Sequence, residues 1–599
     1  MGRLGDGTGS GVTARNARGA ELQVAADRRR SRRFVGLVFV LALVLRLLFW
    51  QSSVDAPWPG SASYKGDAWT WLEYASALQE DRPFELGIPI RPPAMAWVVD
   101  SVWDGGLRNL APLMILWCAL GALAVALFQI AATRAFGLRV GVMTGLLCAG
   151  SSGLMILSTS LNNETLYLAV LGAILVAGPT SRTPKGRLSM VVWGGLNALA
   201  CLIRVEHALF FVLALAWWCA ARVRSDRAAT LRSVLAAGVA FGVALLPWHL
   251  GMWATLDEFN HGSPSSLAAS ERLQEQQERR LAYLAWEADA EAVRDRLPAF
   301  IRRPTSNFVA ATVAHRGRYT VEESDFALVE AAFGYLPEPM SRFPFVVASG
   351  GFNFALANHG GTLGGFEPGP LEARPPLTGG AGTYPPALVR GLPPTQLAFT
   401  YPGHLRLINE GYSLGLSWIR AHPGDAAALV ARKLGIFWRG ASLGMTGWNL
   451  PLEAGGLRRA VDLATPEGTW PGIWRLLFLI VVCRGLVLAW RRPAAAPWLL
   501  FLGSKLIVTC AFYGYARQGA TVVPVIAVLL ALVIDGLVGE ERMEGRALVR
   551  AAVVAGGLLL GAELVRFASD PELLVDGRSL TERSVPDPAD HRARTIEWR

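Results

Sequence analysis

Charged side chains are the first thing this sequence has little of. Asp, Glu, Lys and Arg together make up 17% of the 599 residues, whereas apolar residues make up 52%. An average soluble domain carries about 25% charged residues, so this chain is too apolar for a soluble protein of its length. We therefore expect an integral membrane protein, much of whose surface is covered by lipid.

Disulfide and metal-site patterns are also missing. The six cysteines all fall in predicted apolar segments, where they cannot form the framework of a secreted domain. We interpret them as small core residues. They are Cys118, Cys148, Cys201, Cys219, Cys483 and Cys510. No group of His and Cys has the spacing of a zinc site.

The formal net charge of +10 would indicate nucleic-acid binding in a soluble protein. Here much of the arginine forms short clusters beside apolar runs, a pattern typical of the cytoplasmic loops of membrane proteins. We therefore predict membrane lipid as the surroundings and no nucleic acid as a partner.

Long apolar runs are what the sequence does have. A helix needs roughly 20 mostly apolar residues to cross a bilayer. By this rule we predict an all-α polytopic membrane protein with about eleven transmembrane helices and an extracytoplasmic soluble region of mixed or mostly helical structure. The predicted spans are residues 34–50, 109–132, 138–159, 164–178, 187–203, 206–221, 232–253, 472–490, 496–513, 518–538 and 549–567.

These spans divide the chain into five regions. They are a disordered cytoplasmic tail (1–33), an N-terminal transmembrane module with an outer loop at 51–108 (34–253), an extracytoplasmic region (254–471), the C-terminal transmembrane helices (472–567) and a C-terminal tail (568–599). Within the third region, the charged stretch 270–303 predicts helices, and the Gly- and Pro-rich stretch 350–394 predicts irregular loops.

The distribution of basic residues predicts the orientation. Alternate loops are basic, and the positive-inside bias places such loops in the cytoplasm. These loops contain Arg134 and Arg139; Arg182, Lys185 and Arg187; Arg222, Arg224, Arg227 and Arg232; and Arg491 and Arg492. We therefore predict a multi-pass protein of the cell (inner or plasma) membrane, with its N-terminus in the cytoplasm and both long loops outside.

Two acids lie near the predicted outer face. Asp67 precedes a predicted amphipathic helix whose apolar side would lie flat on the membrane. That side consists of Trp71, Leu72, Ala75 and Leu78. Glu164 opens the fourth span. Each acid either caps its helix, where a carboxylate is favoured, or takes part in chemistry.

Basic residues also lie near that face. Arg204 and Glu206 occupy the tight outer turn between the fifth and sixth spans. An outer arginine runs against the positive-inside bias, so it indicates either an extracytoplasmic anion or a local ion pair with Glu206. Arg517 lies at the outer turn before the tenth span, and Lys505 lies within the ninth. Charges there are costly unless partnered, so we predict one site lined by acids and arginines.

Four motifs occur in a particular order along the chain. They are Asp67 with its amphipathic helix and Arg91-Pro92-Pro93, the stretch from Gly195 to Glu206, Pro247-Trp248 closing the seventh span, and Trp418-Ile419-Arg420-Ala421-His422-Pro423 followed by Arg432 to Trp438. In this order they resemble the GT-C superfamily of polytopic membrane glycosyltransferases, from about residue 34 to about residue 540. The nearest likeness is the branch, similar to glycosyltransferase family 39, that holds protein O-mannosyltransferases and the lipid A aminoarabinose transferase.

Two positions depart from that pattern. Ala68 follows Asp67 where family members often have a second acid, and Trp71 stands where Tyr is usual. The number of acids at the site is therefore an open question at the level of sequence.

The resemblance implies transfer of a hexose or pentose from a polyprenyl-phosphate donor to an extracytoplasmic acceptor, with inversion at the anomeric carbon. On this interpretation, Asp67 is the general base that takes the acceptor proton. Glu164 orients the acceptor or Asp67, with Lys65 and Glu206 in support.

The same resemblance assigns the leaving phosphate to arginines. Arg204 is the first candidate to stabilise its charge, followed by Arg91 and Arg517. We expect no cofactor besides the lipid-linked donor, and no obligatory metal, because a monophosphate needs less charge neutralisation than a diphosphate.

Two other classes of function fit the same composition. A transporter or lipid flippase also needs many helices and charges within the membrane, although we find no internal repeat of the kind many transporters have. A non-catalytic envelope assembly protein would use its outer region, and Asp67 would then be only a helix cap.

Overall fold

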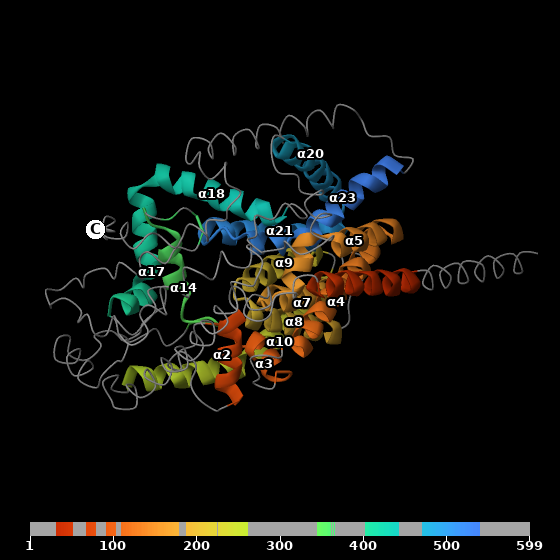
Figure 1. The fold of residues 1–599 in the computed structure, drawn as a ribbon. Helices are drawn as coiled ribbons and strands as arrows, with labels where there is room; N and C mark the ends of the chain where they lie inside the picture. The colour runs from red at the N-terminus through yellow and green to blue at the C-terminus, as the bar shows by residue number, and fades with distance from the viewer. Residues whose placement is uncertain are drawn as a thin grey trace, which may run out of the picture.

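The computed structural model describes residues 31–51, 68–79, 91–103, 110–178, 187–224, 226–261, 344–360, 362, 364–365, 402–441 and 470–538. Nearly all of these residues are helical, and none of them is in a β-strand (Figure 1). The all-α class predicted from the sequence is confirmed.

The N-terminal half begins with a helical segment, Ser31–Gln51, followed by a short pair, α2 (Ala68–Gln79) and α3 (Ala94–Asp100). The helices that follow are α4 (Ala111–Phe136), α5 (Leu138–Gly150), α6 (Ser152–Ser158), α7 (Asn163–Ala177), α8 (Arg187–Ile203), α9 (His207–Arg222) and α10 (Arg227–His261).

The C-terminal half consists of two groups of helices. The first group is α14 (Gly350–Ala357), α17 (Pro402–Ala421) and α18 (Pro423–Ala441). The second group is α20 (Trp470–Trp490), the short 3-10 helix Pro493–Ala495, α21 (Ala496–Ala511), α22 (Ala516–Ala520) and α23 (Val523–Val538).

Four helices in the described part are long and apolar enough to cross a membrane: Ser31–Gln51, Ala111–Phe136, Arg227–Asp257 and Pro493–Ala511. Six shorter apolar helices of 10–17 residues accompany them. The protein is therefore a helical membrane protein with several spans. The predicted total of eleven stays a prediction, because residues 549–567 lie outside the described residues.

The outer side of α10 indicates contact with lipid. Large apolar side chains that are 48–65% exposed repeat every three or four residues, on one face of the helix. They are Leu231, Leu235, Val239, Val243, Leu246 and Leu250. At about 1.5 Å per residue this stripe is about 28 Å long. That length matches the roughly 30 Å hydrocarbon core of a bilayer.

Ten predicted spans coincide with described helices, but two are divided. Span 138–159 breaks at Ser151, which caps α6 by accepting a hydrogen bond from the Leu154 amide. Span 518–538 divides into α22 and α23 near Thr521. The motif Pro247-Trp248 does not close the seventh helix, because α10 continues through Pro247 and past the predicted end at residue 253 to His261.

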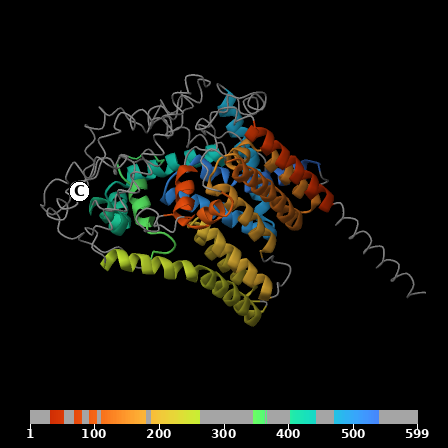
Figure 2. The same cartoon turned by 60° about the horizontal axis from the view of Figure 1, so that its bottom comes forward.

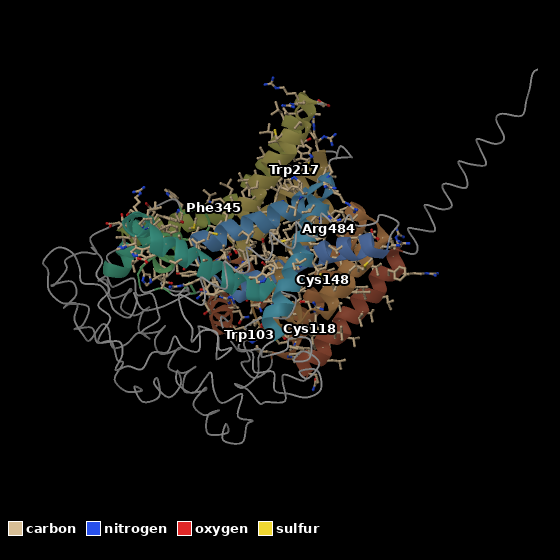
Figure 3. All side chains as sticks on the ribbon, turned by 90° about the horizontal axis from the view of Figure 1, so that it is seen from above. Trp103, Cys118, Cys148, Trp217, Phe345 and Arg484 are labelled. Atoms are coloured by element: carbon tan, nitrogen blue, oxygen red, sulfur yellow. The ribbon has the colours of Figure 1, made fainter. Side chains whose placement is uncertain are left out.

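The bundle is tightly packed through small residues. α4 lies against α5 and α7, α8 lies against α10, and α23 lies against α20 and α5 (Figure 2). Gly194 of α8 faces the backbone of Ala237 in α10 with no room for a side chain, and Gly172 of α7 faces Leu127. Cys118 and Cys148 are buried within the bundle, as predicted from their apolar surroundings (Figure 3). Small residues of this kind let membrane helices approach closely.

The helix after Asp67 does not lie free on a membrane surface. Its residues Trp71, Leu72 and Ala75 are at most 2% exposed and pack with α3 and the start of α4, so the prediction for these three is wrong. Only Leu78 of the predicted apolar side is exposed. A second prediction is wrong at Gly350, where the Gly- and Pro-rich stretch begins with the helix α14 instead of a loop.

The group α14, α17 and α18 lies at one end of the bundle, next to α21 (Figure 1). It is joined to α10 as well. The indole of Trp248 donates a hydrogen bond to the Val346 carbonyl at 2.8 Å, and Phe345 lies beside the ring of His249 (Figure 3). These contacts fix the group relative to the spans.

Candidate functional site: a buried cluster of charges

Charged side chains from four parts of the chain meet at the end of the bundle where α7 begins and α8 ends. Glu164 comes from the first turn of α7, Arg204 and Glu206 from the turn between α8 and α9, Lys505 from α21 and Arg517 from α22. We call these five residues the charge cluster.

Arg204 holds the cluster together. Its Nη1 lies 2.5 Å from Oε1 of Glu164, and its Nε lies 2.5 Å from Oε1 of Glu206. Nη1 also donates to Oδ1 of Asn163 at 3.2 Å. The local Arg204–Glu206 pair considered from the sequence therefore exists, but the same guanidinium also binds an acid 40 residues away.

Glu206 joins Arg204 to Lys505. Nζ of Lys505 lies 3.1 Å from Oε1 of Glu206. Burial by itself would raise the pKa of Glu206, but the neighbouring Arg204 and Lys505 outweigh it and hold that pKa far below the usual carboxyl range. The same pairing, with Glu206 and Glu164, raises the pKa of Arg204 against the effect of burial. Glu206 is therefore ionised throughout the physiological range.

Arg517 gives the charge cluster one more positive charge than negative. Its Nε lies 3.5 Å from Oε1 of Glu164, and its side chain is 29% exposed, whereas that of Glu164 is 1% exposed. The second carboxylate oxygen of Glu164, Oε2, is buried without a hydrogen-bond partner among the described residues. The cluster can therefore attract an anion, and Glu164 has an acceptor atom left for a ligand hydroxyl.

The capping interpretation of Glu164 is wrong. Asn162 is the N-cap of α7, and its Oδ1 accepts from the Thr165 amide at 3.3 Å. The indole of Trp117 donates to the Asn162 carbonyl at 2.9 Å, which anchors this turn to α4. Because Asn162 caps the helix, the side chain of Glu164 is left to pair with Arg204.

A neutral hydrogen-bonded chain supports the cluster. The hydroxyl of Tyr167 lies 2.9 Å from Nδ1 of His207, whose Nε2 lies 2.9 Å from Oδ1 of Asn197. The amide of Asn197 donates to the Trp193 carbonyl, so its Oδ1 accepts from His207, and Nδ1 then accepts from Tyr167. The ring of Tyr167 lies 4.6 Å from Nζ of Lys505, which is a cation–π contact.

Of the remaining predicted site residues, only Arg91 is described, and it lies apart from this cluster. Arg91 lies over the ring of Trp71 at 5.7 Å, and no contact joins it to Glu164 or Arg204 within the described residues. Asp67 and Lys65 lie outside the described residues, as does the predicted helical stretch 270–303. The roles of Asp67 and Lys65 stay predictions.

Three residues of the site were not assigned roles from the sequence: Asn163, Tyr167 and Lys505. Lys505 had the clearest signal, since a lysine in an apolar span indicates a buried partner. Asn163 and Tyr167 had none, because a polar or aromatic residue near a span end is common in membrane helices.

These observations define a class: a multi-span helical membrane protein with a buried, net-positive charge cluster at one end of its bundle. No protein-family model and no curated protein matches the sequence. Among solved structures, the chain is similar to ArnT from Cupriavidus metallidurans bound to undecaprenyl phosphate, with 13% identity and a TM-score of 0.29 over 83% of this chain and 78% of ArnT. At this identity and TM-score the match carries no weight for the activity of this chain.

Proposed function

We propose that this protein is a membrane glycosyltransferase that moves a sugar from a polyprenyl-phosphate-linked donor to an extracytoplasmic acceptor, with inversion. The charge cluster is the observation that supports it. Two arginines and a lysine face two carboxylates in a site that is mostly buried, so these five residues together carry one more positive than negative charge. A departing lipid phosphate needs such preorganised cations.

Each described residue has a role that follows from its contacts. Arg204, held by two carboxylates, stabilises the phosphate from a fixed position. Arg517, which is partly exposed, approaches the phosphate from the open side. Glu164 accepts a hydrogen bond from the acceptor through Oε2. Asp67 is the general base that removes the acceptor proton as the bond to the anomeric carbon forms.

The test is transfer of labelled sugar in vesicles that contain polyprenyl-phosphate donors and either the wild type or Asp67→Asn. We expect only the wild type to consume a donor, while both variants give the same size profile in detergent. If the protein were a non-catalytic assembly protein, Asp67→Asn would not change its function. If neither protein consumed a donor from a broad panel, a flippase would become the better interpretation, and lipid movement across the vesicle membrane would be measured next.

A further inference from the structure

A second buried cation lies outside the charge cluster. Lys433, on α18, is 0% exposed, and its ammonium donates to Oδ1 of Asn358 at 2.9 Å and to the carbonyl of Cys510 at 3.4 Å. Both acceptors are neutral, and within the described residues no carboxylate pairs with Lys433. A buried charge without a counter-ion is costly, so its presence here requires a reason.

The partners of Lys433 lie at the C-terminal end of α21. The last four carbonyls of a helix have no partner inside the helix. At α21, Lys433 occupies the carbonyl of Cys510, and the amide of Asn358 donates to the carbonyl of Ala511 at 2.9 Å. A cation is also favoured at this negative end of the helix dipole. Lys433 and Asn358 together therefore cap α21.

α21 and the turn that follows it carry two members of the charge cluster. Lys505 lies in α21, and Arg517 follows at the start of α22. The turn between them is held against α18: the Gly514 amide donates to the Gly364 carbonyl at 2.8 Å, and a side chain at Gly514 would meet the backbone of Lys433. The position of Arg517 thus depends on where Lys433 holds the end of α21.

We propose that Lys433 is a positioning residue, which sets Arg517 and Lys505 in place for the departing phosphate by capping α21 from outside the bundle. The proposal rests on the proposed function. It also links α14 and α18, which supply Asn358 and Lys433, to the geometry of the charge cluster.

The ionisation of Lys433 gives this role a signature. Burial lowers the pKa of Lys433 to about 8. Because the folded-state pKa lies below the usual lysine value, the ammonium reduces folding stability at neutral pH. This loss begins to shrink as the pH rises through about 8 and is gone only above the usual lysine pKa of 10.5. A residue whose role is to stabilise the fold would instead raise folding stability at neutral pH.

Other ionisable groups face Lys433 from the elements packed around it. Burial lowers the pKa of His359 to about 4 and raises that of Tyr513 well above its usual value. Arg432 is its neighbour on α18, and Arg517 lies on α22. Cys510 on α21 and Tyr515 in the turn complete the set. We therefore expect Lys433, together with Lys505 of the charge cluster, to contribute to an alkaline limb near pH 8 in the turnover of donor.

The experiment compares the wild type, Lys433→Met, Asn358→Asp and Cys510→Ala in donor turnover between pH 6.5 and 9.5. Met fills about the same volume without charge. We expect kcat/KM to fall roughly tenfold or more and the alkaline limb to become weaker, since one charged hydrogen bond is lost. Asp beside Lys433 should move the limb upward by about one pH unit or more, because a carboxylate favours the ammonium. Cys510→Ala should retain the limb.

Amide hydrogen exchange of residues 512–522 provides a second measurement that needs no turnover. We expect faster exchange in Lys433→Met than in the wild type. Wild-type exchange in that variant, or wild-type kcat/KM with an unchanged alkaline limb, would overturn the positioning role. If the wild type consumed no donor at all, the proposed function would fail, and the exchange data alone would decide whether Lys433 holds the turn.

Discussion

Arg204 shows how much of this site depends on one side chain. It pairs with Glu164 and Glu206 and donates a hydrogen bond to Oδ1 of Asn163. All three partners lie within or next to α7 and α9. Its side chain is 9% exposed. Removing one partner of a buried pair costs more than the pair contributes, because the other charge is left without compensation.

Arg204→Met is therefore expected to destabilise the protein by roughly 3–5 kcal/mol, since Glu164 and Glu206 would lose their common partner. The double variant Arg204→Met/Glu164→Gln should recover part of that loss, because a neutral amide tolerates burial better than a carboxylate. Thermal unfolding in detergent measures both. Equal melting temperatures for the single and double variants would show that the Glu164–Arg204 pair is not coupled.

Arg517→Gln is expected to leave the fold intact, because Arg517 is partly exposed and lies 3.5 Å from Glu164. Binding of a polyprenyl-phosphate donor should weaken roughly 10-fold or more, the usual worth of one charge-assisted hydrogen bond. Arg420→Gln, at an exposed position on α17, is the matched control. Binding constants for the donor are measured by fluorescence titration in nanodiscs. An unchanged constant for Arg517→Gln would show that Arg517 does not bind the phosphate.

At the scale of elements, periodicity and length located the spans well. Runs of about 17 or more apolar residues have few structural options besides a helix, because an unpaired backbone cannot be left in lipid. The same reasoning missed the break at Ser151, and the motif Pro247-Trp248 wrongly suggested the end of a helix that continues to His261. A Pro removes one backbone donor, but neighbouring helices can compensate inside a membrane protein, so the residue alone does not decide where a helix ends.

Close approach between elements gives a further prediction. A side chain at Gly514 would meet the backbone of Lys433, and one at Gly519 would meet the Phe437 carbonyl. Gly514→Ala should therefore lower stability by about 1–3 kcal/mol through overpacking and displace the turn before Arg517. Gly503→Ala, where the structure leaves open space, should not lower stability. If the two variants had the same melting temperature, the contact between α18 and this turn would be looser than described.

At the scale of the molecule, the apolar stripe of α10 and the bundle interior define a protein surrounded by lipid. The positions of basic residues predict its orientation. Arg222, Arg224, Arg227 and Arg232 gather around the turn between α9 and α10, the opposite end of α9 from the charge cluster. By the positive-inside bias, we predict that this turn is cytoplasmic and that the charge cluster faces outward.

Cysteine labelling tests this orientation. In a background without the six native cysteines, Asp226→Cys should react with a membrane-impermeant maleimide only after the cells are permeabilised. Ser413→Cys, on an exposed part of α17, should react in intact cells. The opposite pattern would place the charge cluster in the cytoplasm and would contradict an extracytoplasmic acceptor.

The sequence by itself determined the class of fold and most of the spans, because hydropathy and length act locally and lipid permits few backbone structures. It also singled out Glu164, Arg204, Glu206 and Arg517 by the cost of charges at the membrane boundary. Which charges meet was decided only by tertiary structure, since residues 164, 204, 505 and 517 are brought together by the packing of α7, α9, α21 and α22. The capping of α21 by Lys433 depends in the same way on the packing of α18, a contact between distant segments that no local pattern encodes.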